Sequence, residues 1–225
     1  MTDSPREFDL QDYRRVLGKA KALGFVFQTF SQYLESPASK VVLLRHDVDV
    51  SLRRALQMAD IERAEEVTST YFVRVHASLY NLFDKNNFGR LQKLAAMGFE
   101  IGVHQEVSNF ARPGEEEQLL HREKLIIETI LGRRVAGLAT HVPKENTLEI
   151  TPELLERNGF DYAPDLPVFN DGAMFVSDSN NHWKAHSIDE ALESSDKVLA
   201  NIHPIWWTTR IKDVPGMIAF LRSGN

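Results

Sequence analysis

The sequence predicts an α/β fold built on one parallel β-sheet, and three observations lead to this prediction. Short apolar runs alternate with longer amphipathic runs along the chain, which is the order of repeated βα units. The run Val41-Val42-Leu43-Leu44 is apolar at consecutive positions, as in a parallel strand covered on both faces. Glycines stand where the amphipathic runs end, as helix termini favour, at Gly24, Gly98, Gly132 and Gly159. These patterns leave open whether the sheet is open or closed into a barrel.

About seven strands, each followed by a helix, account for most of the chain. We expect strands at residues 41–49, 69–75, 100–106, 135–141, 161–164, 173–178 and 198–204. We expect helices at residues 10–23, 51–66, 84–97, 115–131, 152–158, 188–193 and 214–221. Thr151-Pro152 supplies a cap and a helical proline, and the segment from Ser187 to Glu190 has the pattern of a capping box. No linker divides the chain, so we expect one domain over residues 1–225, with residues 1–38 as a helix and loop packed on it.

Composition and charge exclude several classes of partner and site. The chain of 225 residues has 26 Lys and Arg against 32 Asp and Glu, a formal net charge of −6. This balance argues against binding to nucleic acid or to an anionic membrane surface. The absence of cysteine excludes disulfides, thiolate nucleophiles and cysteine-based zinc sites. No apolar stretch approaches the ~20 residues that span a bilayer, and no signal-peptide pattern is present, so we expect a cytoplasmic protein of open oligomeric state.

Histidine and acidic residues collect where the predicted strands end. Because the carboxyl ends of parallel strands converge, residues far apart in sequence meet there in one cleft. A polar residue that merely ends a strand would explain any one of these positions. It does not explain why His and Asp dominate all seven ends, so we expect a shared functional cleft. The residues concerned are Asp47, Asp49, His76, His104, Glu106, His141, Asp165, Asp178 and His203.

The segment Arg45-His46-Asp47-Val48-Asp49 is the sharpest of these signals. Strand side chains alternate between faces, so Arg45, Asp47 and Asp49 share one face. Two carboxylates about 7 Å apart along a strand repel each other when both are ionised, and such a pair needs a cation. A divalent metal could bind one carboxylate and leave the other as a general base, held ionised by Arg45. The alternative is a purely structural Asp–Arg ion pair.

Two further strand ends carry imidazole groups. His104 and Glu106 share a strand face, and imidazole is the commonest neutral metal ligand, which a carboxylate can orient. His203 is followed by a proline and lies close to Trp206 and Trp207, so it is a candidate acid beside a candidate platform for a sugar ring. Either tryptophan could instead belong to the core.

Taken together and in this order, these motifs resemble the polysaccharide deacetylase superfamily, the NodB-like group of carbohydrate esterase family four. The matching segments are Arg45-His46-Asp47-Val48-Asp49, Thr70-Tyr71-Phe72, Glu100-Ile101-Gly102-Val103-His104, Ser177-Asp178…Trp183 and Asn201-Ile202-His203-Pro204. The resemblance is nearest to a branch with a His-Asp-Val-Asp strand end. It implies a distorted parallel (β/α) barrel of about seven strands. It also implies metal-dependent removal of an N-acetyl group from an amino sugar in a polysaccharide, glycolipid or sugar precursor.

The resemblance also implies a role for each matched residue. Asp47 matches the catalytic base, Asp49 the metal-binding carboxylate, His104 the first metal-binding histidine and His203 the general acid. The metal would be zinc, with cobalt, manganese or nickel as alternatives. We further expect the substrate side of the cleft to include Arg45, Glu106, Asp178 and Trp207.

The chain departs from the family pattern at two places. The second metal histidine is expected four residues after His104, where Ser108 stands, and serine is a poor zinc ligand. Glu106 or His141 could replace it, and we favour His141 because a neutral nitrogen restores the ligand chemistry. The arginine loop expected after the fourth strand is also missing, so that Arg45 or Lys144 would have to hold Asp47 ionised. Two other functions therefore stay open: hydrolysis of a small cyclic amide, and a non-catalytic carbohydrate-binding relative that has lost the metal.

Overall fold

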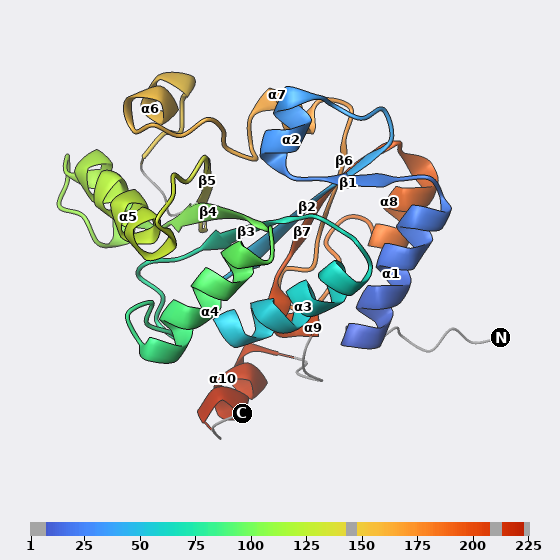
Figure 1. The fold of residues 1–225 in the computed structure, drawn as a ribbon, viewed down its shortest axis with the longest axis horizontal. Coiled ribbons are helices and arrows are strands. Elements are labelled where there is room, and N and C mark those ends of the chain that lie inside the picture. Colours follow the sequence, from blue (N-terminus) through green and yellow to red (C-terminus); the bar gives the residue numbers. More distant parts are fainter. Residues whose placement is uncertain (1–7, 143–147, 208–212, 223–225) are drawn as a thin grey trace.

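The computed structural model describes residues 8–142, 148–207 and 213–222. In this part of the chain a seven-stranded parallel sheet curls into a half-barrel, with helices on its outer face (Figure 1). The predicted fold class is therefore confirmed. The strands are β1 (Val26–Gln28), β2 (Val41–Val48), β3 (Thr70–Val73), β4 (Glu100–Gln105), β5 (Gly137–Thr140), β6 (Met174–Ser177) and β7 (Lys197–Ile202). They are ordered β5-β4-β3-β2-β7-β6, and β1 pairs with β2.

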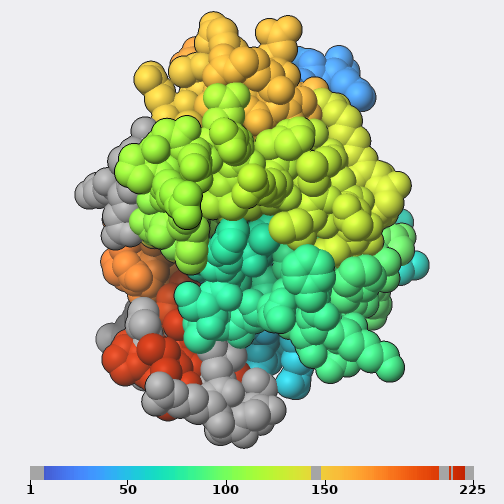
Figure 2. All heavy atoms as spheres, turned by 90° about the vertical axis from the view of Figure 1, so that its left-hand side faces the viewer, coloured from blue at the N-terminus to red at the C-terminus, as the bar shows by residue number. Residues whose placement is uncertain are grey.

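The helices begin and end largely where the sequence signals stand. The larger ones are α1 (Leu10–Ala22), α3 (Leu52–Ala64), α4 (Lys85–Ala96), α5 (Glu116–Leu131), α6 (Pro152–Arg157), α8 (Ile188–Ser194) and α10 (Val214–Arg222). The cap at Thr151 and the capping box from Ser187 to Glu190 are both formed, and α5 ends at Gly132 in a left-handed conformation with φ of 65°. Figure 2 shows α5 and the segments around it covering the molecule on the left-hand side of Figure 1. None of the described helices is long and apolar enough to cross a bilayer.

The count of seven strands is right, but the set of strands differs from the predicted one. Residues 161–164 do not form a strand, and only Tyr162 makes an isolated bridge, to Gly137. Pro164 lacks the N–H that a longer ladder requires, and the chain then enters the short helix α7 (Pro167–Asn170). The seventh strand is β1, whose three residues are too few to show a pattern. It is followed by α2 (Phe30–Glu35), which the sequence analysis also missed.

All six predicted strands that form end one or two residues before the predicted carboxyl end, and two of these ends carry residues of the site. The strand predicted at residues 198–204 ends at Ile202, and Pro204 opens the helical turn α9 (Pro204–Trp207), because proline favours the first helical position. The strand predicted at 100–106 ends at Gln105 and is followed by the 3₁₀ turn η1 (Val107–Asn109). His203 and Glu106 therefore stand on turns just beyond the strands.

The central strand β2 separates the interior of the half-barrel from the helical layer. All eight of its residues are buried. Leu43 packs inside the half-barrel with the aromatic side chains of Phe72 and Tyr162, whereas Leu44 on the other face packs among residues of the outer helices. Gly137 lies against the Tyr162 ring, where a Cβ atom would overlap it. This packed interior supports Arg45 and Asp47, the next side chains on the same face of β2.

A buried polar network fixes the outer face of β2 to the helices. The carboxylate of Glu62 in α3 contacts His46 Nε2 at 2.6 Å and accepts hydrogen bonds from the hydroxyls of Tyr13, Ser69 (2.6 Å) and Tyr71 (3.0 Å). Four groups from α1, β2, β3 and the residue before β3 thus satisfy one carboxylate that is out of contact with water. The network holds the strand that carries the acidic residues of the site.

Candidate active site

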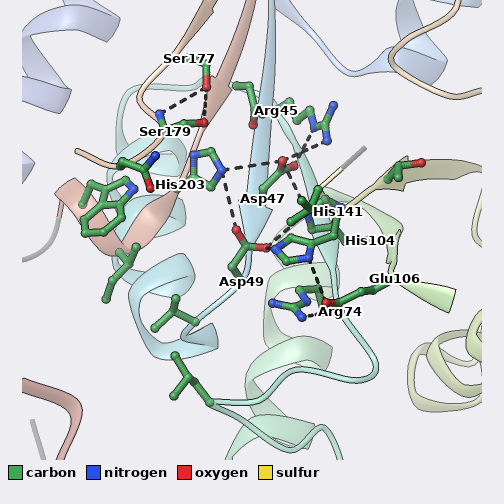
Figure 3. A pocket seen from close by; sticks show the side chains of 18 of the residues that line it. Arg45, Asp47, Asp49, Arg74, His104, Glu106, His141, Ser177, Ser179 and His203 are labelled. Carbon is green, nitrogen blue, oxygen red and sulfur yellow. Dashed lines mark hydrogen bonds and ion pairs between the residues drawn. The ribbon is translucent and has the colours of Figure 1, made fainter. Parts of the chain in front are cut away.

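The residues predicted at strand ends meet around one cavity. The cavity has a volume of about 770 Å³ and opens above the carboxyl ends of β2, β4, β5 and β7 (Figure 3). The parallel register explains the meeting: His46 pairs with Ile202, and Gln105 pairs with Thr140. His203 therefore follows its strand beside Asp47, and His141 follows its strand beside Glu106. The lining includes Arg45, Asp47, Asp49, His104, Glu106, His141 and His203.

Asp47 is held as a carboxylate by its neighbour on the same strand face. Arg45 donates from Nε to Oδ1 at 2.7 Å and from Nη2 to Oδ2 at 3.0 Å, and both side chains are buried. Burial acts to raise the pKa of Asp47, but Arg45, together with His104 and His203, outweighs it and lowers this pKa. Of the two cations that could replace the missing arginine loop, Arg45 makes this pair, and Lys144 falls outside the described residues.

Asp49 faces two imidazole groups from neighbouring strands. Its Oδ1 atom lies 3.3 Å from His104 Nε2 and 3.7 Å from His141 Nε2. This oxygen is buried and has no hydrogen-bond partner among the described residues. Burial raises the pKa of Asp49, yet His104, His203 and His141 together lower it well below its usual range. A buried carboxylate oxygen beside two ring nitrogens, one of them at 3.3 Å, needs either a proton on one of those nitrogens or a bound cation.

An oxygen atom lies 3.4 Å from the other nitrogen of each imidazole, but only His104 Nδ1 forms a hydrogen bond with it; His141 Nδ1 has no hydrogen-bond partner among the described residues. His104 Nδ1 lies 3.4 Å from the carbonyl oxygen of Ala139, and His141 Nδ1 lies 3.4 Å from Glu106 Oε1. Burial lowers the pKa of His141, which favours its neutral form. A proton on Nδ1 of each ring leaves the lone pair of Nε2 directed at Asp49. Such outer partners orient metal-binding histidines in general.

The spacing of these donor atoms fits a small divalent ion. Zinc–nitrogen and zinc–oxygen bonds of about 2.0–2.1 Å in a tetrahedron place neighbouring donor atoms about 3.3 Å apart. The His104–Asp49 distance of 3.3 Å matches this spacing, and the His141–Asp49 distance of 3.7 Å is slightly longer. The described residues therefore do not yet enclose an ion with three ligands, and His141 would have to move toward Asp49 to do so. Asp49 and His104 thus have the spacing of two zinc ligands, and the described residues supply no third ligand at that spacing.

The backbone beside His141 is strained. Val142 has φ of 46°, a conformation that a β-branched residue rarely adopts. Strain of this kind gathers at functional sites, where the surrounding structure enforces it. Glu106, which faces the His141 ring, is held in turn by ion pairing with Arg74 and by Asn109 Nδ2 at 3.1 Å. Glu106 thus lies behind the His141 ring, 3.4 Å from Nδ1, without a hydrogen bond to it. Arg74, which holds Glu106, was not predicted from the sequence.

The buried carboxylate of Asp178 keeps the His203 imidazole in its protonated, positively charged form. Asp178 is fully buried and accepts from His203 Nδ1 at 2.6 Å, from the His203 backbone N–H at 3.0 Å and from Trp207 Nε1 at 2.7 Å. Burial lowers the pKa of His203, but Asp178 outweighs this effect, and Asp49 and Asp47 add to it, so that the pKa is raised to about 9. His203 Nε2 then faces the cavity, 3.7 Å from Asp49 Oδ2 and 4.0 Å from Asp47 Oδ2.

The placement of Asp178 and Trp207 corrects the expectation that they contact substrate. Both oxygens of Asp178 are occupied by His203 and Trp207, and Trp207 is only 1% exposed. Trp207 packs against Tyr13 and Phe8 in the outer core. The aromatic side chains that line the cavity are instead Trp206 and Phe175. Of the two other residues predicted to reach the cleft, Asp165 lines the cavity. His76 does not line it, and its Nδ1 atom lies 2.7 Å from Glu123 Oε1.

Comparison with solved structures finds proteins of the same fold. No protein-family model matches the sequence, and no curated protein matches it. Among solved structures, the chain is similar to the Streptococcus pyogenes deacetylase PplD in complex with acetate, with 17% identity and a TM-score of 0.54, over 85% of this chain and 79% of that one. It is also similar to the peptidoglycan deacetylase PdaC from Bacillus subtilis, with 17% identity and a TM-score of 0.51, over 84% of this chain and 86% of that one.

A third similar structure is a mutant of a CE4 family pseudoenzyme, described as having restored enzymatic activity; the wild-type pseudoenzyme comes from Bacillus anthracis. Its identity is 16% and its TM-score 0.53, and the match covers 84% of this chain. The chain spans 64% of the length of that protein. At these identities the comparisons establish the fold. Because deacetylases and a pseudoenzyme share it, the function has to be argued from the side chains in the cavity.

Proposed function

We propose that this protein is a metal-dependent hydrolase that removes the N-acetyl group from an amino sugar in a polysaccharide, glycolipid or sugar precursor. The observation that carries the proposal is the convergence of a buried carboxylate oxygen and two ring nitrogens: Asp49 Oδ1 lies 3.3 Å from His104 Nε2 and 3.7 Å from His141 Nε2. Asp49, His104 and His141 would hold the ion. Zinc suits two nitrogens and one oxygen best, and cobalt, manganese or nickel are alternatives.

The residues around this site divide the work of amide hydrolysis. A bound divalent ion would supply Lewis-acid polarisation of the acetyl carbonyl and activation of a water. Asp47, fixed in one orientation by the two hydrogen bonds from Arg45, accepts the proton of the attacking water at a carboxylate oxygen. His203, protonated at neutral pH because Asp178 supports its charge, donates the proton from Nε2 to the departing amine nitrogen. The acid and the base are thus separate groups with opposite charges.

Release of acetate together with metal analysis tests the proposal. Purified protein is loaded with zinc, cobalt, manganese or nickel and incubated with a panel of N-acetylated sugars, and free acetate is measured. Asp49→Ala is expected to lose both metal and activity, whereas Asp47→Asn should lose activity and keep the metal. Protein that binds none of these metals, or that releases no acetate from any of the sugars when loaded, would contradict the proposal.

A second function is kept open by the Ser108 substitution and by the pseudoenzyme among the similar structures. A carbohydrate-binding relative without turnover would bind sugar equally well with and without a chelator. A small cyclic amide is less well supported as the substrate, since the cavity of about 770 Å³ is large and lined in part by exposed Phe175.

A further inference from the structure

The hydroxyl group of Tyr80 joins the carboxyl ends of β2 and β3. Val48 and Val73 form the last pair of the parallel register between these strands. At this pair, the Tyr80 hydroxyl donates to the carbonyl oxygen of Val48 at 2.7 Å and accepts from the backbone N–H of Arg74 at 3.0 Å. The hydroxyl has one proton, so the carbonyl oxygen of Arg74, 3.1 Å away, is a secondary acceptor. One side chain thus holds two strand ends together where the ladder stops.

The backbone groups that Tyr80 holds belong to the peptide groups leading into Asp49 and Arg74. A peptide group is planar, so the Val48 carbonyl oxygen lies in one plane with the Cα atom of Asp49. A hydrogen bond to this oxygen restricts the rotation of the plane, and with it the direction in which the Asp49 side chain leaves the backbone. The same holds for the peptide group from Val73 to Arg74, whose N–H donates to Tyr80. Because β2 ends at Val48 and β3 at Val73, Asp49 and Arg74 follow the paired segments directly.

Asp49 and Arg74 reach the proposed metal site by different routes. Asp49 supplies the carboxylate oxygen itself, 3.7 Å from His141 Nε2. Arg74 is only 8% exposed and forms an ion pair with Glu106, whose Oε1 atom lies 3.4 Å from His141 Nδ1. The Tyr80 hydroxyl therefore holds the backbone of the carboxylate on one side of the His141 ring and of the arginine that fixes Glu106 on the other.

Tyr80 is itself held in place. Its ring packs against the hydrophobic core that β3, β4 and α4 share. Burial raises the pKa of Tyr80 well above its ordinary value, although the hydrogen bond with Arg74 acts in the opposite direction, so the hydroxyl keeps the proton that it donates to Val48. Ser78 and Leu79, directly before Tyr80, line the cavity. The hydroxyl is thus a fixed point between the cavity wall and the site.

We propose that Tyr80 is a positioning residue for the metal site: its hydroxyl fixes the peptide groups before Asp49 and Arg74 and so sets the place of the Asp49 carboxylate opposite the imidazoles. Where it concerns the metal, this inference rests on the proposed function. The hydroxyl touches neither substrate nor ion and acts through the backbone of the two strand ends. The aromatic ring alone is therefore not enough, and the hydroxyl oxygen is required.

Zinc affinity, measured in competition with a chelator, tests the inference. Tyr80→Phe removes only the hydroxyl oxygen and should weaken zinc binding about tenfold, as loss of an outer partner of a metal site does. Tyr71→Phe is the matched control, because it removes a buried hydroxyl that donates to Glu62 at 3.0 Å on the other face of the sheet. Glu62 keeps its three other partners, so the zinc affinity of this control should stay within about twofold of the wild-type value. A purely structural hydroxyl would lower the stability of both variants and the zinc affinity of neither.

The opposite results are equally clear. Zinc affinity of Tyr80→Phe within about twofold of the wild-type value, or an equal loss in Tyr71→Phe, would overturn the inference. Should Tyr80→Phe not fold, as judged by circular dichroism, the wild-type protein decides, because unprotected hydrogen exchange at the Arg74 amide would exclude its bond to Tyr80.

NMR on metal-free protein separates this inference from the proposed function. Wild-type protein that binds no zinc contradicts the hydrolase, whereas the role of Tyr80 still makes a prediction. In Tyr80→Phe the Arg74 amide should exchange about tenfold faster and the amide resonance of Asp49 should move, with Leu43 in the middle of β2 unchanged. An Asp49 resonance that stays in place would overturn the positioning role even if zinc binds.

Discussion

Replacing Asp178 with asparagine is expected to lower the pKa of His203 by about two units. Burial alone would lower this pKa, and Asp178 at 2.6 Å from Nδ1 outweighs burial and raises the pKa from 6.5 to about 9. The difference corresponds to about 3 kcal/mol, at 1.36 kcal/mol for each pKa unit. Asparagine keeps an acceptor oxygen for the Trp207 indole but removes the negative charge. Without that charge, burial lowers the pKa of His203 and only Asp49 and Asp47 still raise it, so the pKa should fall most of the way back toward its ordinary value.

The same shift fixes the sign of the pH dependence of stability. The folded-state pKa of His203 lies above the unfolded value, so its contribution to the free energy of unfolding is complete below pH 6.5 and is lost as the pH rises through about 9. The stability difference between wild type and Asp178→Asn should therefore be largest near pH 6. It should shrink by about 3 kcal/mol by pH 10.

Two measurements follow these expectations. Imidazole resonances are titrated by NMR in metal-free protein, and urea unfolding is measured at several pH values between 6 and 10. Asp165→Asn removes one negative charge from the exposed side of the cavity and serves as the matched control, with a smaller expected change in the His203 pKa. A His203 pKa that stays within half a unit of its wild-type value in Asp178→Asn would refute the assignment of Asp178 as the group that charges His203.

Three further predictions concern the support of the site and the fold. Glu106→Gln should weaken zinc binding by about 10–100-fold in competition with a chelator, because the Glu106 carboxylate lies behind the His141 ring; unchanged affinity would exclude a role in placing this ring. Glu62→Ala should lower the free energy of unfolding in urea by about 3–5 kcal/mol, since it removes the acceptor that four buried groups share, and a loss below 1 kcal/mol would contradict the network. Gly137→Ala should destabilise the protein by about 1–3 kcal/mol through overlap with an aromatic ring, whereas Gly89→Ala in α4, with open space around it, should stabilise it by about 0.5–1 kcal/mol. Equal effects of the two alanines would contradict the packing argument.

The alternation of apolar and amphipathic runs was enough to predict the parallel α/β fold, and the limits lay in short segments. The run from Val41 to Leu44 is apolar because both faces of β2 are covered, so its strand could be recognised without any neighbour. The segment at 161–164 is just as buried at Tyr162, but burial there comes from the aromatic side chain filling the half-barrel and not from a ladder. Sequence alone does not distinguish these two causes of an apolar position.

The site residues that lie at strand ends could be predicted from the sequence, whereas those whose exposure depends on packing or strand order could not. Asp47, Asp49, His104 and His203 follow from the rule that parallel strands converge, because β-strand alternation fixes which face each residue takes. Trp206 and Trp207 lie on a helical turn, where successive side chains point about 100° apart, so the choice between cavity and core depends on how α9 packs. Phe175 is exposed only because β6 is an edge strand, and strand order was not predicted.

Ser108, which stands where a metal-binding histidine was expected, has to be considered together with His141, which could replace that ligand. Ser108 alone would place it with inactive relatives, because a carboxylate and one histidine make an incomplete site. However, the pairing of Gln105 with Thr140 sets the first residue after β5 beside the first residue after β4, so a ligand can arrive from either strand end. His141 occupies that position, with Glu106 behind it and Asp49 in front of it. Asp49 Oδ1 lies between His104 Nε2 and His141 Nε2, and the proposed metal site rests on this convergence.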